Sequence, residues 1–378
     1  MISIDPRTVI LLAGVMSGFM AVILFSLKRN YPPTIKGLGE WAVALVMVTV
    51  GAVLGFGVGQ WPNFVSITIP RVLFPVGLFL TYVGTQRFFG VAPRIAPWLA
   101  LIGVGTLVQM WFTFVTPNFP LRLLVANAMG ACLFSAFALF LRKQGRLSFA
   151  KALTLAVLLA MLAVLVMRMV TAFVWPVGTD ILDTSPQHLI YVTSFSFFIV
   201  LLSVSLVLMA AERLHDEVAY LASHDSLTNA LTRRHMNEVC AIELDRSRRH
   251  GRSMALLVMD LDHFKAVNDA HGHQRGDQVL VDFVAKVNGL LRRPDQLARF
   301  GGEEFVALLP ETSLEEALGV AERIREACAA PDAGSSCTVS IGVTTNHSAG
   351  DTVDTLIARA DAAMYLAKAR GRNRVEAA

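Results

Sequence analysis

The sequence predicts two parts of different fold class: an all-α transmembrane bundle, followed by an α/β domain with a central mixed, mainly antiparallel sheet. Its composition is too apolar for an ordinary soluble protein, with 54% hydrophobic and 16% charged residues. Long apolar runs precede residue 212, whereas charged residues are dense after it. Strand and helix patterns alternate in the second part. We therefore expect a membrane region at 1–211, a helical connector at 212–224 and a separate domain at 225–378.

Apolar segments long enough to cross a bilayer make up the first part. A hydrocarbon core of about 30 Å needs roughly 20 apolar residues per helix. About seven segments meet that requirement, at residues 8–27, 38–59, 70–89, 96–116, 122–141, 152–174 and 188–211. An odd number of spans places the two ends of this region on opposite sides of the membrane.

The loops between these segments indicate their orientation. Basic residues gather in alternate loops, which the positive-inside rule assigns to the cytoplasm: Lys28, Arg29, Lys36, Arg87, Arg94, Arg142, Lys143, Arg146 and Lys151. The loop from Trp175 to Gln187 carries Asp180 and Asp183 and no lysine or arginine. We expect this loop and the N-terminus outside, and the C-terminal domain in the cytoplasm.

Polar side chains within the spans are candidates for function. Arg168 lies several residues inside an apolar run, where a guanidinium group needs a partner or water. It either belongs to a ligand pocket or extends to the outer interface beside Trp175. We interpret Gln109 and Asn127 as interhelical hydrogen-bonding groups rather than ligand contacts.

The last apolar segment continues into the second part without proline or glycine. Val207, Leu214 and Leu221 recur every seven residues, with Ala211 and Val218 at the intervening core spacing. This pattern favours a short parallel coiled coil between two protomers, although a plain amphipathic helix satisfies it nearly as well.

Charge and cysteine content narrow the class of partner. The net charge of +4 is modest, and no basic stripe indicates a nucleic-acid partner. The cysteines show no C-x-x-C spacing, so we expect free thiols in a reducing compartment: Cys132, Cys240, Cys328 and Cys337.

The second part shows the alternation of an α/β sandwich. Helices are expected near residues 233–250, 276–291, 314–329 and 353–369. Strands are expected at 254–260 and 337–344, together with a hairpin that joins strands at 296–300 and 305–309.

Acidic residues follow two of these strands. The hairpin turn reads Gly301-Gly302-Glu303-Glu304, where the glycines permit positive φ and close approach of a phosphate. The strand at 254–260 ends in Asp260-Leu261-Asp262. Carboxylates at neighbouring strand ends suit Mg²⁺, which takes oxygen ligands and shares them with substrate phosphates. Lys265 is placed to meet the same phosphates as a point charge.

The segments DLDHFKAVNDAHGHQRGD (260–277) and GGEEF (301–305) resemble the signature of GGDEF-domain diguanylate cyclases, in the GGEEF variant. The resemblance covers nearly all of 222–378 and includes Lys368 and Arg372. The opening segment at 225–233 departs from the family pattern D-x-L-T-G-L-x-N-R, with Asn229, Ala230 and Thr232 in place of glycine, leucine and asparagine. Asparagine tolerates left-handed backbone better than most residues, so we expect a preserved turn.

The resemblance implies a role for each matching residue. Asp260, Glu303 and the backbone carbonyl of Leu261 would bind Mg²⁺, or Mn²⁺ in its place, and Glu304 would assist a second metal ion or deprotonate the attacking hydroxyl. The substrate would be bound by Asn268 and Asp277 at the guanine, by Lys265, Lys368 and Arg372 at the triphosphate, and by Phe264, Gly301 and Gly302, with Arg299 steadying the turn. Asp262, His273 and Asp269 are expected to be structural, Asp269 as a helix cap.

The resemblance also implies the reaction and its setting. Two GTP molecules would form cyclic di-GMP and two pyrophosphates in a homodimer, since each domain binds one GTP. Arg292 and Asp295 form an R-x-x-D pair at the place of the family's product-binding inhibitory site; a solvated charged turn is the other interpretation. The protein would be a multi-pass protein of the bacterial inner membrane, in contact with the lipid bilayer and with a periplasmic N-terminus.

Two rival functions remain open from the sequence. A catalytically inactive GGDEF-like domain would bind GTP or cyclic di-GMP and signal through a partner, but it need not keep every charge of the site. A transporter with a regulatory tail would require interrupted helices and internal repeats, which the sequence does not show.

Overall fold

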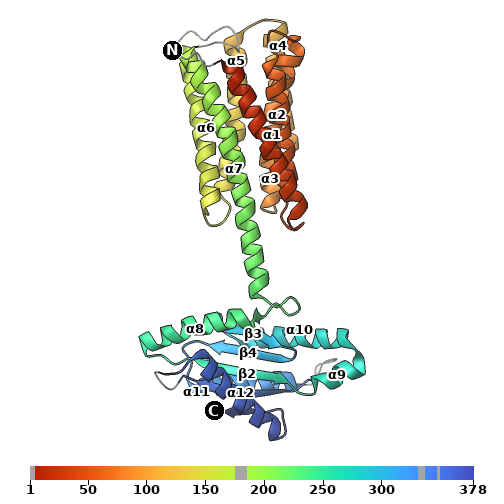
Figure 1. Ribbon diagram of the computed structural model, residues 1–378, viewed down its shortest axis with the longest axis vertical. Helices are drawn as coiled ribbons and strands as arrows, with labels where there is room; N and C mark the ends of the chain where they lie inside the picture. The colour runs from red at the N-terminus through yellow and green to blue at the C-terminus, as the bar shows by residue number, and fades with distance from the viewer. Residues whose placement is uncertain (1–4, 175–184, 331–336, 347–349) are drawn as a thin grey trace. The chain divides into compact units, whose positions relative to one another are not determined.

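The computed structural model describes residues 5–174, 185–330, 337–346 and 350–378. Asp180 and Asp183, expected in an outer loop, lie outside the described residues. The chain divides into two compact units, Met1–Asp216 and Glu217–Ala378. The first unit is helical and the second combines helices with a sheet (Figure 1).

The described residues contain seven helices long and apolar enough to cross a membrane, as the sequence predicts. They are α1 (Pro6–Asn30), α2 (Leu38–Phe56), α3 (Ile69–Phe88), α4 (Ala96–Phe114), α5 (Phe119–Arg142), α6 (Phe149–Val174) and α7 (Pro186–Ser223). A short π-helical segment, Phe64–Thr68, precedes α3. Helix α2 ends before the expected residue 59, and α7 continues past the expected residue 211.

Capping side chains and prolines account for the beginnings of α1 and α5. Asp5 accepts a hydrogen bond from the backbone N–H of Arg7 at 2.9 Å, ahead of α1. Asn118 accepts from the N–H of Leu121 at 3.1 Å, ahead of α5. Both helices carry proline in the first turn, where an N–H would have no helical acceptor.

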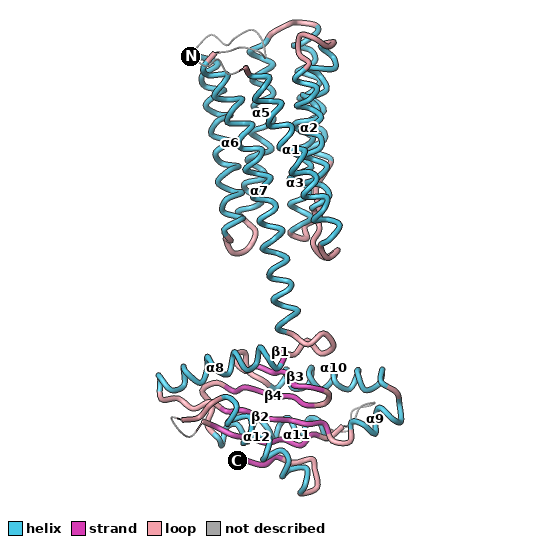
Figure 2. Tube along the Cα trace, in the orientation of Figure 1, coloured by secondary structure: helices cyan, strands magenta, loops and turns pink. Residues whose placement is uncertain are grey.

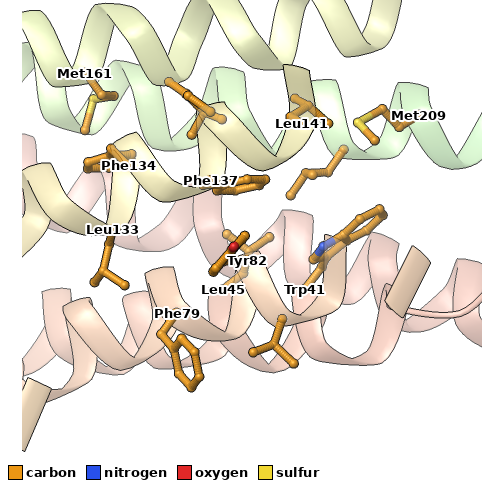
Figure 3. Close-up of a cluster of buried hydrophobic side chains, with 14 of the residues drawn as sticks. Trp41, Leu45, Phe79, Tyr82, Leu133, Phe134, Phe137, Leu141, Met161 and Met209 are labelled. Atoms are coloured by element: carbon orange, nitrogen blue, oxygen red, sulfur yellow. The ribbon is translucent and has the colours of Figure 1, made fainter. Parts of the chain in front are cut away.

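The bundle has an aromatic core and an apolar outer surface. Trp41, Tyr82 and Phe137 pack at its centre (Figure 3), and the Trp41 indole donates to the carbonyl oxygen of Thr81 at 3.1 Å. On the outside, large apolar side chains such as Phe19 are exposed, in this case by 68%. Such exposure is unfavourable in water and neutral in lipid, which agrees with a membrane-spanning bundle.

Helix α7 is continuous from the bundle into the connector, as expected. Glu212 on α7 accepts from the Ser148 hydroxyl at 2.5 Å and from the N–H of Ala150 at 3.0 Å, at the beginning of α6. A carboxylate at a helix N-terminus is stabilised by the unpaired N–H groups there. Val218 and Leu221 are more than half exposed. The coiled coil between protomers stays a prediction.

The described part of the second unit is built on a six-stranded mixed sheet, which confirms the predicted class. The strands are β1 (Leu231–Thr232), β2 (Ala255–Leu261), β3 (Gln296–Gly301), β4 (Glu304–Leu309), β5 (Val339–Thr345) and β6 (Val375–Ala377). Their order is β1-β3-β4-β2-β5-β6, with antiparallel central pairs and parallel outer pairs. Figure 2 shows β1, β3, β4 and β2 side by side in that order. The sequence did not predict β1 and β6, because two or three residues carry no periodic signal.

Helices cover both faces of this sheet. They are α8 (Arg233–His250), α9 (Phe264–His271), α10 (His273–Leu290), α11 (Leu314–Ala329) and α12 (Val353–Ala369). Leu257 and Met259 of β2 pack with side chains of α10 and α11, whereas Leu256 and Val258 pack with side chains of α8 and α12. Every residue of β2 is buried for this reason. Helix α9 is absent from the predicted elements.

A glycine sets the distance between α12 and the sheet. A Cβ atom on Gly342 of β5 would lie 2.0 Å from the carbonyl oxygen of Ala360 and 2.3 Å from the backbone nitrogen of Met364. Glycine therefore permits an approach that any side chain would block. This packing brings Lys368, near the end of α12, to the edge of the sheet where β2 ends.

Candidate active site

Two neighbouring central strands place acidic residues at the same end of the sheet, where β2 ends and β4 begins; this end is called the active edge below. Because β2 and β4 are antiparallel, Asp260 lies directly opposite Glu304. The N–H of Leu261 donates to the carbonyl oxygen of Glu303 at 3.3 Å. Opposite residues in such a pair have Cα atoms about 4.5–5.5 Å apart. The structure thus brings together the four residues to which the resemblance assigns metal binding.

These acidic groups differ in exposure. Asp260 is only 6% exposed, Glu303 is partly buried and Glu304 is exposed. These strand ends therefore carry one buried carboxylate, that of Asp260, and one solvent-accessible carboxylate, that of Glu304. An accessible carboxylate is free to contact a substrate hydroxyl, whereas a buried one is suited to a fixed cation.

Lys368 contacts the buried carboxylate directly. Its Nζ lies 2.7 Å from Oδ2 of Asp260. Burial raises the pKa of Asp260 above its ordinary value, and the nearby Lys368 and Arg372 only partly oppose this effect. The site thus concentrates a costly buried charge and two cationic side chains at the same strand edge, a pattern typical of functional sites.

The donor set fits a divalent cation that arrives with its substrate. Among the described residues, no group of three or more histidine, cysteine or acidic side chains is arranged to hold a metal ion. Mg²⁺, however, is commonly bound by one or two carboxylates together with substrate phosphates. Asp260, Glu303 and the carbonyl of Leu261 supply such a partial set at adjoining strand ends.

Asp262 is structural, as the sequence suggests. Its carboxylate accepts from the hydroxyls of Thr338 and Ser340, each at 2.7 Å, and from the N–H of Asn373 at 3.0 Å. It therefore joins the end of β2 to β5 and to the turn that contains Arg372, whose φ is 63°. Through these bonds Asp262 positions a predicted phosphate-binding residue.

The glycine turn is held by Arg299, as predicted. Its Nε and Nη2 donate to the carbonyl oxygen of Gly302 at 2.9 and 2.8 Å, and its Nη1 donates to Asp225 at 3.1 Å. Gly302 has a φ of 45°, and neither it nor Gly301 has an atom near the position of a Cβ. Open space therefore adjoins the turn, where a nucleotide can approach.

Asp225 links this turn to the opening segment of the domain. It accepts from the backbone N–H and hydroxyl of Thr228 at 2.9 and 2.7 Å. Burial acts to raise its pKa, but the hydrogen bonds from Thr228 and Arg299 outweigh burial and lower it. Asn229 has a φ of 59°, which confirms the predicted left-handed turn. Sequence reasoning did not assign Asp225 a role, although the pattern Asp-x-x-Thr is typical of a side-chain-capped turn.

The predicted guanine-binding residues lie on two consecutive helices. Asn268 belongs to α9 and Asp277 to α10, which are joined at Gly272. A Cβ on Gly276 would lie 1.9 Å from Oδ1 of Asn268, so glycine leaves room for this amide. Phe264 is 6% exposed and packs in the core, and its predicted contact with the substrate stays a prediction. Lys265 is exposed one residue further on.

The two residues of the R-x-x-D pair, Arg292 and Asp295, contact each other. The backbone N–H of Arg292 donates to Oδ2 of Asp295 at 2.8 Å, and its Nη2 donates to the hydroxyl of Thr312 at 2.7 Å. The Asp295 side chain is 1% exposed, whereas that of Arg292 is 55% exposed. The Asp295 carboxylate therefore holds this loop, and of the two side chains that of Arg292 is the accessible one. The inhibitory site at Arg292 and Asp295 stays a prediction.

The fold and this edge together define the class: a membrane protein whose second unit is a nucleotidyl-cyclase-like domain. Residues 222–374 match the family model described as "Diguanylate cyclase, GGDEF domain". The chain therefore carries a GGDEF domain, joined to seven apolar helices that fit a membrane sensor.

Curated relatives match this part of the chain. Diguanylate cyclase DgcM of Escherichia coli strain K12 is 39% identical over 169 residues, which are 44% of this chain and 41% of DgcM. Diguanylate cyclase DgcP of Pseudomonas aeruginosa is 43% identical over 161 residues, which are 41% of this chain and 24% of DgcP. The chain thus spans less than half the length of these relatives.

A solved structure, the coiled coil and GGDEF domain of DgcB from Caulobacter crescentus in complex with c-di-GMP, matches 47% of this chain and 97% of its own, with 31% identity and a TM-score of 0.44.

Proposed function

We propose that this protein is a membrane-bound diguanylate cyclase that condenses two GTP molecules into cyclic di-GMP and releases two pyrophosphates. The observation that carries the proposal is the meeting of Asp260, Glu303 and Lys368 at one strand edge of a GGDEF domain. Pyrophosphate leaves from a GTP, and positioning and charge neutralisation supply most of the catalysis in such transfers.

The phosphates are bound by cations at this edge. Bound Mg²⁺, or Mn²⁺ in its place, would be held by Asp260, Glu303 and the carbonyl of Leu261 and would neutralise the developing negative charge. Lys368 and Arg372 lie close enough to Asp260 to lower its pKa, and both therefore face the same phosphates. Lys265 approaches from α9, where it is exposed.

Glu304 acts on the attacking group. It is exposed at the rim of the edge, opposite Asp260, and takes the proton of a 3′-hydroxyl or assists a second metal ion. The freed 3′-oxygen then forms a bond to the α-phosphorus of the other GTP, and the bond from that phosphorus to pyrophosphate breaks. The same exchange occurs twice to close the ring.

Guanine is selected by hydrogen bonding on α9 and α10. The carboxylate of Asp277 accepts from the N1 and N2 donors of guanine, and Asn268 completes the recognition. Adenine lacks these donors, so a carboxylate desolvated against it would stay unpaired.

The reaction requires two copies of the domain. Each site holds one GTP, so the two nucleotides meet only when two domains face one another. Helix α7 runs without interruption from the bundle to Ser223, which offers a mechanical link between the membrane region and the facing arrangement. We place the protein in the bacterial inner membrane, with a periplasmic N-terminus and a cytoplasmic GGDEF domain.

A Glu304→Gln variant tests the activity. Because Glu304 is exposed, the fold should persist while cyclic di-GMP synthesis falls by about 10²–10⁴-fold, the range for loss of an acid–base group. Synthesis is measured by chromatography of the nucleotide products with GTP and Mg²⁺, in full-length protein. Glu315→Gln, an exposed acid in the first turn of α11, serves as the control and should keep full activity. Undiminished synthesis by Glu304→Gln would refute the assigned site.

Product inhibition is proposed at Arg292. Its exposed guanidinium group is suited to a phosphate or a guanine edge of cyclic di-GMP. Arg292→Ala should retain initial activity and lose inhibition by added product, because the backbone bond to Asp295 does not need the side chain. Progress curves with and without added cyclic di-GMP measure this. Equal inhibition of variant and wild type would remove Arg292 from the regulatory site.

A further inference from the structure

A cavity of about 360 Å³ lies inside the helical bundle of the first unit. The seven long helices of the described residues all contribute side chains to its wall. Its volume falls within the range of about 300–1,000 Å³ typical of small-molecule pockets. None of its lining residues belongs to the candidate active site, so a ligand bound here would act on the membrane region.

Two buried amide side chains that line this cavity have unused hydrogen-bond donors. Gln109 of α4 and Asn127 of α5 are each 3% exposed. Among the residues that the structure describes, the side-chain nitrogens of both amides have no hydrogen-bond partner. The interpretation of these groups as interhelical hydrogen bonds is therefore wrong for these nitrogens, because both amides lie at the cavity. A buried donor without an acceptor is unfavourable, so an acceptor bound in the cavity would stabilise the bundle.

The two amides lie at a similar depth in the bundle. Helices α4 and α5 run in opposite directions and pack closely, since a Cβ atom on Gly105 would lie 2.9 Å from Sδ of Met129. Gln109 follows Gly105 on α4, and Asn127 precedes Met129 on α5, so both are displaced from this contact toward the same end of the bundle. At 1.5 Å per residue the two displacements differ by about 3 Å. Both donors therefore serve the same end of one ligand.

Contacts within the bundle hold two of the three arginines of the wall. Arg71, Arg122 and Arg168 line the cavity as well. Arg71 donates to the hydroxyl of Thr113 at 3.0 Å, and Arg168 lies over the ring of Tyr191 at 3.6 Å. A role of Arg168 in ligand binding stays a prediction. A ligand that binds the two amides needs no charge, because amide N–H groups are uncharged donors.

The deeper part of the wall is apolar. Leu45, Phe134, Met161 and Leu206 line it and also belong to the core of the bundle, where Figure 3 labels the first three. Phe134 lies on α5 about 10 Å beyond Asn127, away from the end of the bundle where α5 begins. The cavity thus combines N–H donors toward one end with hydrocarbon toward the other.

We propose that the bundle binds an uncharged single-chain carbonyl compound, a medium-chain ketone, in this cavity. The carbonyl oxygen accepts from the amide nitrogens of Gln109 and Asn127, and its two lone pairs suit two donors. The alkyl chain lies against the apolar wall, where burial of hydrocarbon adds affinity. Lipid surrounds membrane-spanning helices, and an uncharged molecule enters hydrocarbon at a far lower cost than an anion does.

Direct binding tests this site independently of cyclase activity. Full-length protein in phosphatidylcholine nanodiscs is titrated with tritiated 2-undecanone, with empty nanodiscs as the background for partition into lipid. Three unlabelled competitors separate the features of the ligand: undecane has the chain without the oxygen, acetone has the carbonyl without the chain, and decanoate carries a charge. We expect saturable binding that each of the three displaces at least about tenfold less well than unlabelled 2-undecanone does.

Variants locate the carbonyl group. Gln109→Leu and Asn127→Leu should each weaken binding of 2-undecanone by about tenfold, as for the loss of one hydrogen bond. Both variants should fold, because an apolar side chain replaces a buried donor that has no acceptor in the described structure. Gln86→Leu is the matched control. It removes a buried amide of α3 outside this cavity and should bind as wild type does.

Several outcomes would overturn the proposal. Absence of saturable binding to wild-type protein would leave the two donors to water. Equal displacement by undecane would show that the carbonyl group is not recognised, and equal displacement by acetone would show that the apolar wall is not used. Stronger displacement by decanoate would show that the ligand is an anion. Unchanged binding by both Gln109→Leu and Asn127→Leu, or equal weakening by Gln86→Leu, would place the ligand elsewhere.

Discussion

Burial of the Asp260 carboxylate lowers the stability of the folded state at neutral pH. Its raised pKa means that the folded state prefers the protonated form. By linkage, its favourable contribution to folding is complete below the ordinary value of 3.8 and is lost as the pH rises through the raised value. At neutral pH the ionised group is therefore a net cost to folding.

An Asp260→Asn variant should separate stability from activity. The amide is nearly isosteric and uncharged, so at neutral pH in EDTA the second unit should be as stable as wild type or more stable, while cyclic di-GMP synthesis is lost. Circular dichroism melting from pH 3 to 7 measures the difference, which should close as the pH falls toward 3.8. If Asp260→Asn is less stable than wild type at pH 7 and the difference disappears at low pH, the sign assigned here to the contribution of Asp260 to folding is wrong.

The single residues of the site differ in how far the sequence reveals them. Asp260, Glu303 and Glu304 stand out because acidic pairs at strand ends are chemically conspicuous. The turn-anchoring role of Asp225 and the burial of Phe264 do not stand out, because both depend on contacts with segments distant in the chain.

At the scale of elements, the docking of α12 on β5 determines the geometry of the active edge. Lys368 reaches Asp260 only because α12 approaches the sheet closely at Gly342. The capping box of Thr352 and Thr355 begins this helix, and Arg359 secures it by donating to Asp351 at 2.8 Å. The helix is therefore positioned independently at its start and along its length.

A Gly342→Ala variant should displace α12. The added Cβ would overlap backbone atoms of Ala360 and Met364, which cannot move as a flexible side chain would. We expect a destabilisation of about 3 kcal/mol or more, with loss of amide protection in α12 and β5 in hydrogen-exchange mass spectrometry. Activity should fall with it.

Gly319→Ala is the matched control. Gly319 lies inside α11, and nothing lies within 4 Å of an added Cβ. Alanine there should stabilise the helix by about 0.5–1 kcal/mol. If both substitutions have the same effect on exchange in α12, the close approach at Gly342 is not what positions this helix.

The elements that the sequence predicts are long enough for their apolar residues to repeat with the period of a helix or a strand. The elements that appear close to their expected bounds are the seven apolar helices, the strands β2, β3, β4 and β5, and the helices α8, α10, α11 and α12. Helix α9 was not predicted because it has only eight residues and follows an N-cap residue, His263, in the left-handed region, with φ of 60°. Its position depends on packing with α10, not on its own periodicity.

At the scale of the whole molecule, the distribution of basic residues predicts the orientation of the bundle. A reporter that is active only in the cytoplasm should be active when fused after Arg146 and when fused after Ala211. Both fusion points follow an odd number of predicted spans, and Arg146 lies in a basic loop. A fusion after Pro117 should be inactive with that reporter and active with a periplasmic one. The reverse pattern would place the GGDEF domain outside and exclude access to GTP.

The sequence by itself determined the two fold classes, the number of apolar helices and the family of the second unit. Apolar length, strand period and a contiguous motif are local properties, and each can be read along the chain. Only the tertiary structure decided which groups Asp262 joins, that Lys368 pairs with Asp260, and that Arg71, Arg122 and Arg168 line one cavity. Those relations join residues far apart in the chain, and packing alone brings such residues together.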